Sequence, residues 1–416
     1  MPRLSLCLVA ILFCHPGEVC GQSTDESGDP PTRWNEYRGA RFDLLFGAGA
    51  LLDLGAYTQD AGSRSLVGDH EDLERGEIRA VRAFVAGEIR IPHPVGYMIG
   101  GAYRAFDQGF DTDTDEVFTW FDVQVFTPIP RVGVLTVGKM KEPISLAREM
   151  SLAWEELLER PMHLDAFLPS RNIGVRLANT HGDGRLRWAV GAYNAWLEQE
   201  GVGFSEMSRQ GILRASGLPV SRPDHREWLH LGLGFRYSDA RLGYVQFGTS
   251  PEAFPLPRYV DTERVSADHA ATWNFEAAWS RGPWWLSGEF TQVGVAAVDG
   301  VDPTFRGGHL SAVWAVTGEH RRYRPDAGVV DRAEPRASVH EGGWGLLELA
   351  VRASWVDMTD GTIDGGEALR WSVGANWYPT ADTRVSATWG LVDLERAGTT
   401  GRTGILQARW MILMGP

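Results

Sequence analysis

Cysteine, lysine and long apolar runs are scarce in this sequence of 416 residues, and each scarcity excludes a class of protein. Its three cysteines, Cys7, Cys14 and Cys20, lie near the N-terminus, so the rest of the chain has no disulfide, thiolate nucleophile or thiolate metal ligand. Of its 40 basic residues, only Lys139 and Lys141 are lysines. It has no apolar run of the roughly 18 residues that a membrane-spanning helix needs, which excludes a helical membrane protein.

Charge and composition narrow the remaining classes. The net charge is −14, which argues against nucleic acid as a partner because a phosphate backbone needs a basic face. Hydrophobic residues make up 43% of the chain, which rules out disorder, and the 49 glycines and 17 tryptophans favour strands and turns over a helical bundle. A chain of this length holds either two or three ordinary domains or one large β-barrel.

The first 21 residues are typical of a secretory signal peptide. Arg3 precedes an apolar stretch from Leu4 to Cys14 that is too short to span a bilayer, and the small residues of “EVCGQS” follow. We therefore expect cleavage near Gly21 and an exported protein. An uncleaved membrane anchor and a lipoprotein modified at Cys20 fit this pattern less well.

Apolar and polar residues alternate through segments of about ten residues. In “ATWNFEAAWS”, at 271–280, Trp273 and Phe275 share one face while Asn274 and Glu276 lie on the other. The same alternation runs through “RWAVGAYNAW”, “LLELAVRASW” and “TRVSATWGL”. A period of two residues predicts strands with one apolar and one polar face.

Periodicity alone does not separate a soluble β-sandwich from a membrane barrel, but three details favour the barrel. The strands are about ten residues long, as a tilted membrane-crossing strand needs, whereas sandwich strands average nearer five or six. Their apolar faces often end in tryptophan or tyrosine, as expected at a lipid interface. Their polar faces carry Arg, Glu and Asp, which suits a wet lumen.

Seventeen segments are candidate strands. An even number is expected of a single-chain bacterial barrel, and the Ser208 segment is the weakest candidate, so we expect sixteen strands around a water-filled channel. The barrel domain would cover 41–416, after a short polar segment over 22–40. The candidates start near Arg41, Glu77, Gly96, Glu116, Val132, Arg171, Arg185, Ser208, Trp228, Ala240, Ala270, Pro283, Gly307, Trp344, Ala368, Thr383 and Gly404.

One stretch differs from everything around it. “EPISLAREMSLAWEELLERP”, at 142–161, is rich in good helix formers and begins and ends near a proline. It belongs to a connection of about 30 residues, and long structured loops inside compact domains are usually functional. We expect this third loop to be partly helical and to fold into the lumen. A surface helix without a role and an inner plug are the alternatives.

The same region resembles the phosphate-selective porin O and P family. The segments “VGKMKEPISLAREMS” and “LERPMHLDAFLPSRNIGVRL” are similar to the family's central block, and “LSAVWAVTGEHRRY”, “GGWGLLELAVRASWVDMTD” and “GANWYPTADTRVSATW” to its C-terminal hairpins. The resemblance implies a 16-stranded antiparallel transmembrane β-barrel in the outer membrane of a Gram-negative-type bacterium. It also implies a trimer, an inward third loop and an arginine-lined lumen that passes anions. The matching central residues are Gly138, Lys139, Pro143, Ser145, Leu146, Glu159, Arg160, Pro169, Arg171, Asn172 and Gly174.

The chain departs from the family at several positions. Where the family often has adjacent arginines, Arg79 is kept, Ala80 replaces the second, and Arg82 follows on the polar face of its strand. The lysine cluster that the family uses for phosphate capture has no equivalent in a chain with two lysines. The last strand lacks the usual terminal aromatic residue, and Trp410 is the nearest.

The candidate site is a pore constriction. The sequence contains no motif for catalysis, for a metal or for a cofactor, and the adjacent Glu155 and Glu156 are expected to be solvated loop charges. The expected partners are small anionic solutes, outer-membrane lipid and further copies of the chain. The residues expected to line the constriction are Lys139, Lys141, Arg148, Arg160, His163, Arg171, Arg82 and Arg90.

The expected function is passive diffusion of small hydrophilic solutes with a moderate preference for anions such as phosphate. From Lys139 to Arg171 the sequence has five positive and six negative side chains, a net of −1, so no tight phosphate site is expected. The preference is assigned to Arg82, Arg160, Arg171 and the two lysines. A general or cation-tolerant porin and a secreted all-β carbohydrate-binding protein are the alternatives.

The signal-peptide assignment predicts that the mature protein starts close to Gln22, where the charged, apolar and small-residue regions end. The intact mass of the purified protein measures this directly. A mass that still includes Cys7 would rule out export by this route.

Overall fold

The computed structural model describes residues 34–70, 73, 76–90, 92–103, 118–182, 184–194 and 209–415. The predicted signal peptide and most of the predicted polar segment lie outside these residues. The large sheet has 18 strands, of which β1 (Glu36–Arg38) and β11 (Tyr244–Val245) are short extensions and the other sixteen form the wall. The wall consists of β2 (Asp43–Gln59), β3 (Gly76–Arg90), β4 (Pro94–Tyr103), β5 (Phe118–Ile129), β6 (Gly133–Met140), β7 (Asn172–His181), β8 (Leu186–Asn194), β9 (Gln210–Arg222), β10 (Glu227–Asp239), β14 (Val265–Arg281), β15 (Trp284–Ala297), β16 (Thr304–Ala315), β19 (Leu346–Asp360), β20 (Ile363–Thr380), β21 (Thr383–Arg396) and β22 (Thr399–Met414).

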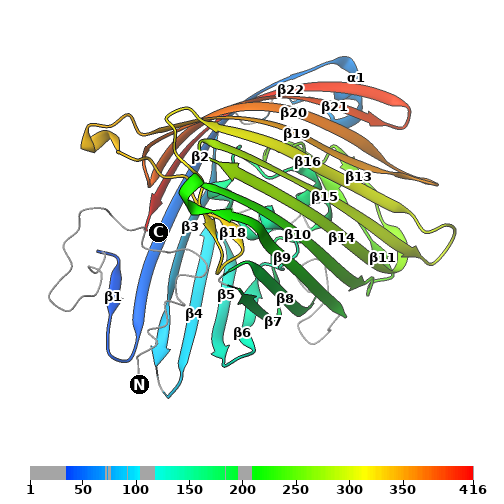
Figure 1. Cartoon of the computed structure of the whole chain (residues 1–416). Coiled ribbons are helices and arrows are strands. Elements are labelled where there is room, and N and C mark those ends of the chain that lie inside the picture. Colours follow the sequence, from blue (N-terminus) through cyan, green and yellow to red (C-terminus); the bar gives the residue numbers. More distant parts are fainter. Residues whose placement is uncertain are drawn as a thin grey trace.

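The sheet closes on itself. Each wall strand pairs antiparallel with the next, and β22 pairs with β2 in a register that places Leu54 opposite Ala408. The barrel with sixteen wall strands is therefore confirmed (Figure 1). The candidate near Ala240 is the wrong one of the seventeen, because the chain turns there at Gly243 and adds only β11 before it leaves the wall. The candidate near Ser208, which looked weakest, is the full-length β9.

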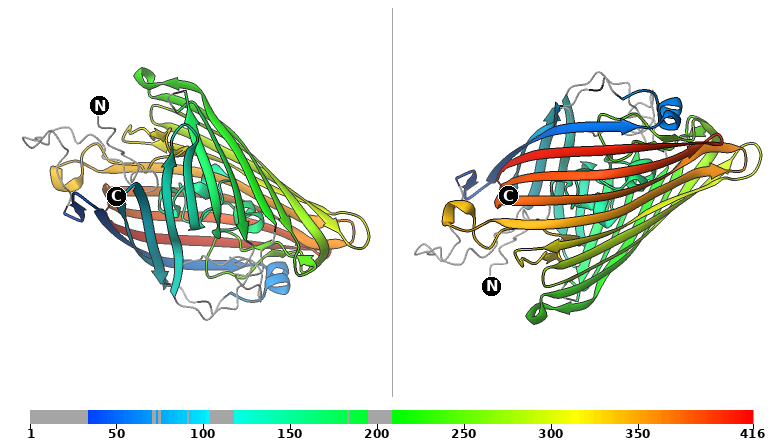
Figure 2. Two further views of the ribbon diagram at one scale, coloured as in Figure 1. Left: turned by 90° about the horizontal axis from the view of Figure 1, so that it is seen from below. Right: turned by 90° about the horizontal axis from the view of Figure 1, so that it is seen from above.

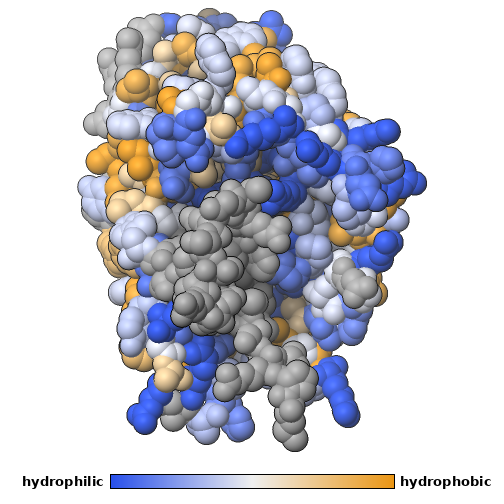
Figure 3. Space-filling view, turned by 60° about the vertical axis from the view of Figure 1, so that its left-hand side comes forward, coloured by the Kyte–Doolittle hydropathy of each residue, from blue (hydrophilic) through white to orange (hydrophobic). Residues whose placement is uncertain are grey.

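The two faces of the wall have the polarity of a membrane barrel. On β14, Trp273 and Phe275 are exposed on the outside, whereas Asn274 and Glu276 are buried on the inside. A soluble sandwich would bury its apolar face, so this reversed arrangement decides between the two folds that periodicity left open. On the side seen in Figure 3, hydrophilic side chains gather in the middle and hydrophobic ones towards the left edge. The described part of the chain has no helix both long and apolar enough to cross a membrane.

The two ends of the barrel differ. One end, where β22 finishes opposite the start of β2, has mostly short turns, including the η4 turn (Pro223–His225) between β9 and β10. We call it the short-turn end. The opposite, long-loop end carries α1 (Ala61–Val67), which follows β2 and packs against β22. Residues 316–345 break this pattern, because this long connection leaves β16 at the short-turn end and includes η5 (Val339–Glu341), which protrudes there (Figure 1).

Among the described residues, three connections enter the lumen: loop 3 (residues 141–171), loop 5 (residues 240–264) and turn 6 (residues 316–345). Loop 3 contains α2 (Leu146–Glu149), η2 (Leu152–Trp154) and α3 (Met162–Phe167), and nearly all of it is buried. The partly helical, inward-folded third loop is therefore present, and it is visible between the walls in Figure 2.

Loop 5 and turn 6 hold loop 3 from opposite ends of the barrel. Loop 5 forms the small β12–β13 sheet (Gly248–Thr249 and Val260–Asp261) and packs Phe247 against Phe167, with ring centroids 5.8 Å apart. Turn 6 forms the β17–β18 sheet (Tyr323–Arg324 and Val329–Val330). Its Val329 and Val330 join the apolar cluster that contains Trp154.

Buried arginines of the wall bind the backbone and carboxylates of loop 3. Arg352 of β19 donates through Nη2 to Glu156 Oε1 at 2.8 Å and through Nη1 to the Glu159 carbonyl at 2.7 Å. Its guanidinium also lies within ion-pair distance of Glu155 (3.4 Å) and of Glu252 in loop 5 (3.3 Å). Because a guanidinium carries five donors in a fixed plane, one side chain can hold two loops.

Other wall arginines repeat this contact around the barrel. Arg384 of β21 donates through Nη1 to the carbonyls of Ala153 (3.2 Å) and Glu155 (2.9 Å). Arg409 of β22 pairs with Asp53 Oδ2 at 2.6 Å and also binds the Leu158 carbonyl. Loop 3 is thereby bound along its length to the side of the wall formed by β19–β22.

Wall carboxylates bind the start of α2. Glu276 Oε2 accepts a hydrogen bond from the amide of Leu146 at 2.6 Å, and Glu289 Oε1 accepts one from the amide of Ala147 at 2.7 Å. Amides at the start of a helix lack intrahelical partners, so these bonds satisfy donors that would otherwise be buried unpaired. Opposite charges on wall and loop thus position loop 3 on one side of the lumen.

Replacing Arg352 with methionine should release loop 3. The change leaves Glu155, Glu156 and Glu252 buried without their shared cation, so we expect the free energy of unfolding to fall by about 3 kcal/mol or more. Urea titrations of the refolded protein, followed by tryptophan fluorescence, measure this change. Arg306→Met is the matched control, because Arg306 forms an exposed pair with Asp357 and should change stability by only about 0.5 kcal/mol. Equal unfolding midpoints for the two variants would contradict the anchoring role.

Candidate functional site

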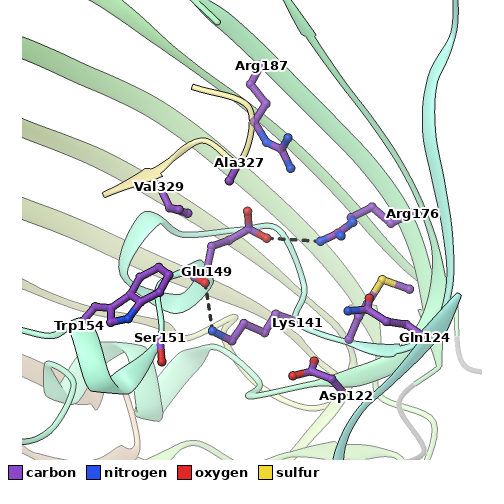
Figure 4. A pocket seen from close by; sticks show the side chains of 11 residues that line it. Asp122, Gln124, Lys141, Glu149, Ser151, Trp154, Arg176, Arg187, Ala327 and Val329 are labelled. Carbon is purple, nitrogen blue, oxygen red and sulfur yellow. Dashed lines mark hydrogen bonds and ion pairs between the residues drawn. The ribbon is translucent and has the colours of Figure 1, made fainter. Parts of the chain in front are cut away.

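A cavity lies between loop 3 and the wall beside β5–β8 (Figure 4). Its volume is about 40 Å³, enough for a few water molecules. Loop 3 forms one side of the cavity, strands β5–β8 form the other, and turn 6 completes the lining. The lining residues are Asp122, Gln124, Met140, Lys141, Glu149, Ser151, Trp154, Arg176, Arg187, Ala327 and Val329.

Inward and outward residues alternate along each wall strand, and the polar lining residues occupy inward positions. On β5, Asp122 and Gln124 are buried while Val123, between them, is exposed on the outer wall. On β7, Arg176 is likewise buried beside the exposed Val175. Arg187 occupies the corresponding face of β8 and reaches towards turn 6.

The three cations of the cavity are incompletely paired. Arg176 lies 3.5 Å from Glu149 through Nη1, and within the described ranges its Nε has no hydrogen-bond partner. Arg187 donates through Nη1 to the Asp326 carbonyl at 2.9 Å and has no ion pair among the residues that the structure describes. Lys141 donates to the carbonyls of Glu149 (3.0 Å) and Met150 (2.7 Å). These groups retain donor capacity towards a solute.

The two carboxylates of the cavity each have a cationic partner outside the lining. Asp122 accepts two hydrogen bonds of 3.1 Å from Arg171, and Glu149 lies 3.3 Å from Arg214. The lining itself holds Lys141, Arg176 and Arg187 beside Asp122 and Glu149. Since Arg171 and Arg214 offset the carboxylates, the local electrostatic potential is positive even though the chain is acidic overall.

Two of the eight predicted pore residues belong to this cavity or adjoin it. Lys141 lines it, and Arg171 binds its Asp122. Arg82 lies on the inward face of β3 together with Ala80, and its guanidinium stands 5.7 Å from the centre of the Phe121 ring, which Arg171 also covers at 5.0 Å. Arg82 therefore lies against the same ring as Arg171 but is not among the residues that line the cavity.

Arg148 and Arg160 stabilise the interior of loop 3 instead of facing the cavity. Arg148 donates to the Leu168 carbonyl at 2.8 Å and pairs with Asp165 at 3.0 Å. Arg160 donates through Nη2 to the Met150 carbonyl at 2.8 Å. Both side chains are largely buried, so the sequence-based assignment of these arginines to the pore is corrected to a structural one.

Two further predicted residues, Lys139 and Arg90, lie elsewhere. Lys139 shares the outward face of β6 with the exposed Val137 and donates to the Trp120 carbonyl, so it is on the outer wall. Arg90 ends β3 at the short-turn end, where it pairs with Asp43 and Glu88. Lys139 has the outward parity of its strand, and Arg90 lies at the end of its strand. Neither side chain therefore faces the lumen.

His163 and the two glutamates of loop 3 are buried in its contacts with the wall. His163 stacks on His309 of β16, with ring centroids 5.2 Å apart, and does not reach the cavity. Glu155 and Glu156 are not solvated as the sequence suggested, because each is only 1% exposed. Burial, reinforced by repulsion from Glu156, raises the pKa of Glu155 to about 8.

Sequence reasoning missed most of the cavity. The inward parity of “RNIGVRLAN” and “RWAVGAYNAW” would have identified Arg176 and Arg187, and the parity of β5 would have identified Gln124. Ala327 and Val329 of turn 6 had no such signal, because nothing in that segment indicates that it enters the barrel. Across the described ranges there is no group of three or more His, Cys, Asp and Glu residues that could hold a metal ion.

Comparison with known proteins agrees with this architecture. Residues 107–412 match the profile described as phosphate-selective porin O and P. An uncharacterized protein of Caulobacter vibrioides is 29% identical over 247 residues, which cover 58% of this chain and 50% of that protein. The chain thus spans about half the length of this curated relative.

Solved porin structures resemble the barrel. The anion-selective porin from Comamonas acidovorans superposes with a TM-score of 0.54 at 11% identity, covering 90% of this chain and all of that one. Pseudomonas putida OprB at high pH gives 0.53 at 10% identity, covering 90% and 94%. Salmonella typhi OmpF in complex with daunomycin gives 0.53 at 12% identity, covering 91% and 100%. At these identities the likeness shows the fold alone. The profile match extends over most of the chain, and the protein therefore belongs to the phosphate-selective porin O and P family.

Proposed function

We propose that this protein is an outer-membrane channel for passive diffusion of small hydrophilic solutes, with a moderate preference for anions. The observation that supports the preference is the cavity beside β5–β8, where Lys141, Arg176 and Arg187 keep unused donor capacity. No bond is made or broken during passage. Selectivity arises from the charge around the narrowing and from its width, both of which loop 3 and turn 6 determine.

The acidic net charge is compatible with this proposal. Several carboxylates, among them Glu367, Asp393 and Glu395, lie at the long-loop ends of β20 and β21. Exposed charges act over about one Debye length, roughly 8 Å at physiological ionic strength, so carboxylates at the barrel end have little effect on an ion inside the lumen. The charges around the cavity therefore dominate the selectivity.

The alternative of a cation-tolerant porin is favoured by one specific observation. Asp122 and Glu149 line the same cavity as the three cations. Their pairing with Arg171 and Arg214 reduces their attraction for a permeating cation, so we rank this alternative second. The outward apolar wall argues against a secreted carbohydrate-binding protein, since such a surface would be exposed to water.

The proposal includes the remaining sequence-based expectations. Residues 1–21 act as the export signal, the barrel domain extends over 41–416, and the outer wall contacts outer-membrane lipid. Phosphate is one of the small anions expected to pass, without a tight site for it.

Replacing Arg176 and Arg187 together with glutamine should shift the reversal potential towards cations. Two unit charges about 4 Å apart interact by about 1 kcal/mol even in bulk water, so each lost cation should lower the anion-to-cation permeability ratio about fivefold. Planar-bilayer recordings across a potassium chloride gradient measure this. Arg222→Gln, at an exposed pair with Glu227, is the control and should leave the ratio unchanged. A wild type that prefers cations, or an unchanged ratio in the double variant, would contradict the assignment.

Arg160 and Arg171, to which the sequence assigned part of the anion preference, are less suitable for this test. Arg160 binds carbonyls of loop 3, so its removal would disturb the loop. Arg171 neutralises Asp122, so its removal would leave that carboxylate without its cation. Arg176 and Arg187 can be changed with less disturbance, because Arg176 keeps only one long ion pair and Arg187 one backbone contact.

A detergent-resistant homotrimer is also part of the proposal. Exposed apolar side chains such as Trp371, Val373 and Trp389 form a wall that lipid or neighbouring copies can cover. We expect a trimer on unheated gels and after chemical cross-linking, converting to a monomer on boiling. A monomer under all three conditions would refute this assembly.

A further inference from the structure

One uncharged hydrogen-bond acceptor of the cavity lining, the side-chain oxygen of Gln124, takes no part in the ion pairs there. Gln124 of β5 is only 4% exposed, and its Nε2 points to the sulfur of Met98 at 3.9 Å. Its Oε1 is buried and has no hydrogen-bond partner within the part of the chain that the structure describes. Because a thioether sulfur accepts but does not donate, this contact fixes the orientation of the amide and leaves Oε1 as its unused end. A residue of the cavity lining therefore keeps an unused acceptor beside the donors.

A simple halide ion does not match this combination. Arg176 Nε and Gln124 Oε1 belong to the same lining, one an unused donor and the other an unused acceptor. A halide can accept from Arg176 but cannot donate to Gln124. A bound halide would leave this buried acceptor unpaired, which costs about 1–3 kcal/mol relative to a bound solute that donates a hydrogen bond to it. The cavity is thus complementary to an anion that also carries a hydrogen-bond donor.

The carboxylates of the lining favour an anion with a single negative charge. Asp122 and Glu149 stand in the same lining as Arg176 and Arg187. The two arginines can hold a monoanion, whereas a dianion would bring a second negative charge close to the two carboxylates. The planar guanidinium forks of the two arginines match the two oxygens of a carboxylate.

The remaining lining accepts a short carbon skeleton. Trp154 of loop 3 and Ala327 and Val329 of turn 6 give the cavity an apolar side. A volume of about 40 Å³ favours acids of two or three carbons. A matching solute places its carboxylate at the arginines, its carbon skeleton against this apolar side and its hydroxyl group at Gln124. It thus contacts the cationic groups, the apolar groups and the acceptor of the lining.

We propose that this cavity is a subsite for small hydroxycarboxylate monoanions and that Gln124 distinguishes them from simple carboxylates. The proposal rests on the channel function described above and specifies its solute class. Arg176 and Arg187 bind the carboxylate, and Gln124 Oε1 accepts the hydrogen bond of the hydroxyl group.

Glycolate and acetate form the matched pair of probes, because they differ by one hydroxyl group. Wild-type channels in planar bilayers carry a chloride current, and each acid is added at increasing concentration. We expect glycolate to reduce the chloride current at concentrations at least about fivefold lower than acetate, which corresponds to about 1 kcal/mol for one hydrogen bond. Hydrogenphosphate at a pH where it is mainly divalent should reduce it less than glycolate does.

Two variants at one position supply the controls. Gln124→Met keeps the length of the side chain and removes the acceptor, so the difference between glycolate and acetate, each measured against the variant's own chloride current, should disappear. Gln124→Asn keeps an amide acceptor and should retain part of the difference.

The outcomes separate this proposal from the channel function. Equal effects of glycolate and acetate on the wild type, or a difference that persists in Gln124→Met, overturn the role of Gln124 even if anion-selective currents are recorded. Stronger block by divalent phosphate overturns the preference for monoanions. Failure to record any channel from correctly folded wild-type protein overturns both proposals.

Discussion

The contact between wall arginines and loop 3 is the interaction on which the rest of the structure depends. Several backbone carbonyls of loop 3, such as those of Ala153 and Glu159, accept hydrogen bonds from wall side chains and would otherwise lose these buried partners. Arg352, Arg384 and Arg409 donate to those carbonyls and to neighbouring carboxylates. Their strands set the position of loop 3, and its position leaves the gap beside β5–β8 that forms the cavity. A rearrangement on one side of the barrel would therefore change the opening on the other.

The same contact explains why the sequence uses arginine so much more than lysine. A wall side chain here binds two or three acceptors that lie in different directions, as Arg352 does with Glu156 and the Glu159 carbonyl. A planar guanidinium meets that requirement with fixed geometry, while an ammonium is a compact charge that is costlier to dehydrate. The sequence keeps a lysine at position 141, where two carbonyls adjoin each other and a compact group suffices.

The fold could be predicted further than the site. A period of two residues identified strands such as β14 and β21. Successive residues of a wall strand point outward and inward in turn, and outward residues are mostly apolar while inward ones are mostly polar. The same pattern gave a wrong prediction near Ala240, because β10 ends at Asp239 and the chain then turns at Gly243. Charge alone could not assign Arg160 or Arg148, because an arginine on an inward-folded loop can face either the solute or the loop itself. Turn 6 could not be predicted from local pattern, since its place in the lumen results from contacts with Trp154 and Arg187 far away in sequence.

Turn 6 also makes the lumen unsymmetrical along the barrel axis. Loop 3 enters from the long-loop end and brings Lys141 and Glu149 to the cavity, whereas turn 6 enters from the short-turn end and brings Ala327 and Val329. The two ends of the lumen are therefore filled by segments of different length and chemistry. For the channel function proposed above, the two directions of passage are not equivalent, because each begins at a different inserted segment.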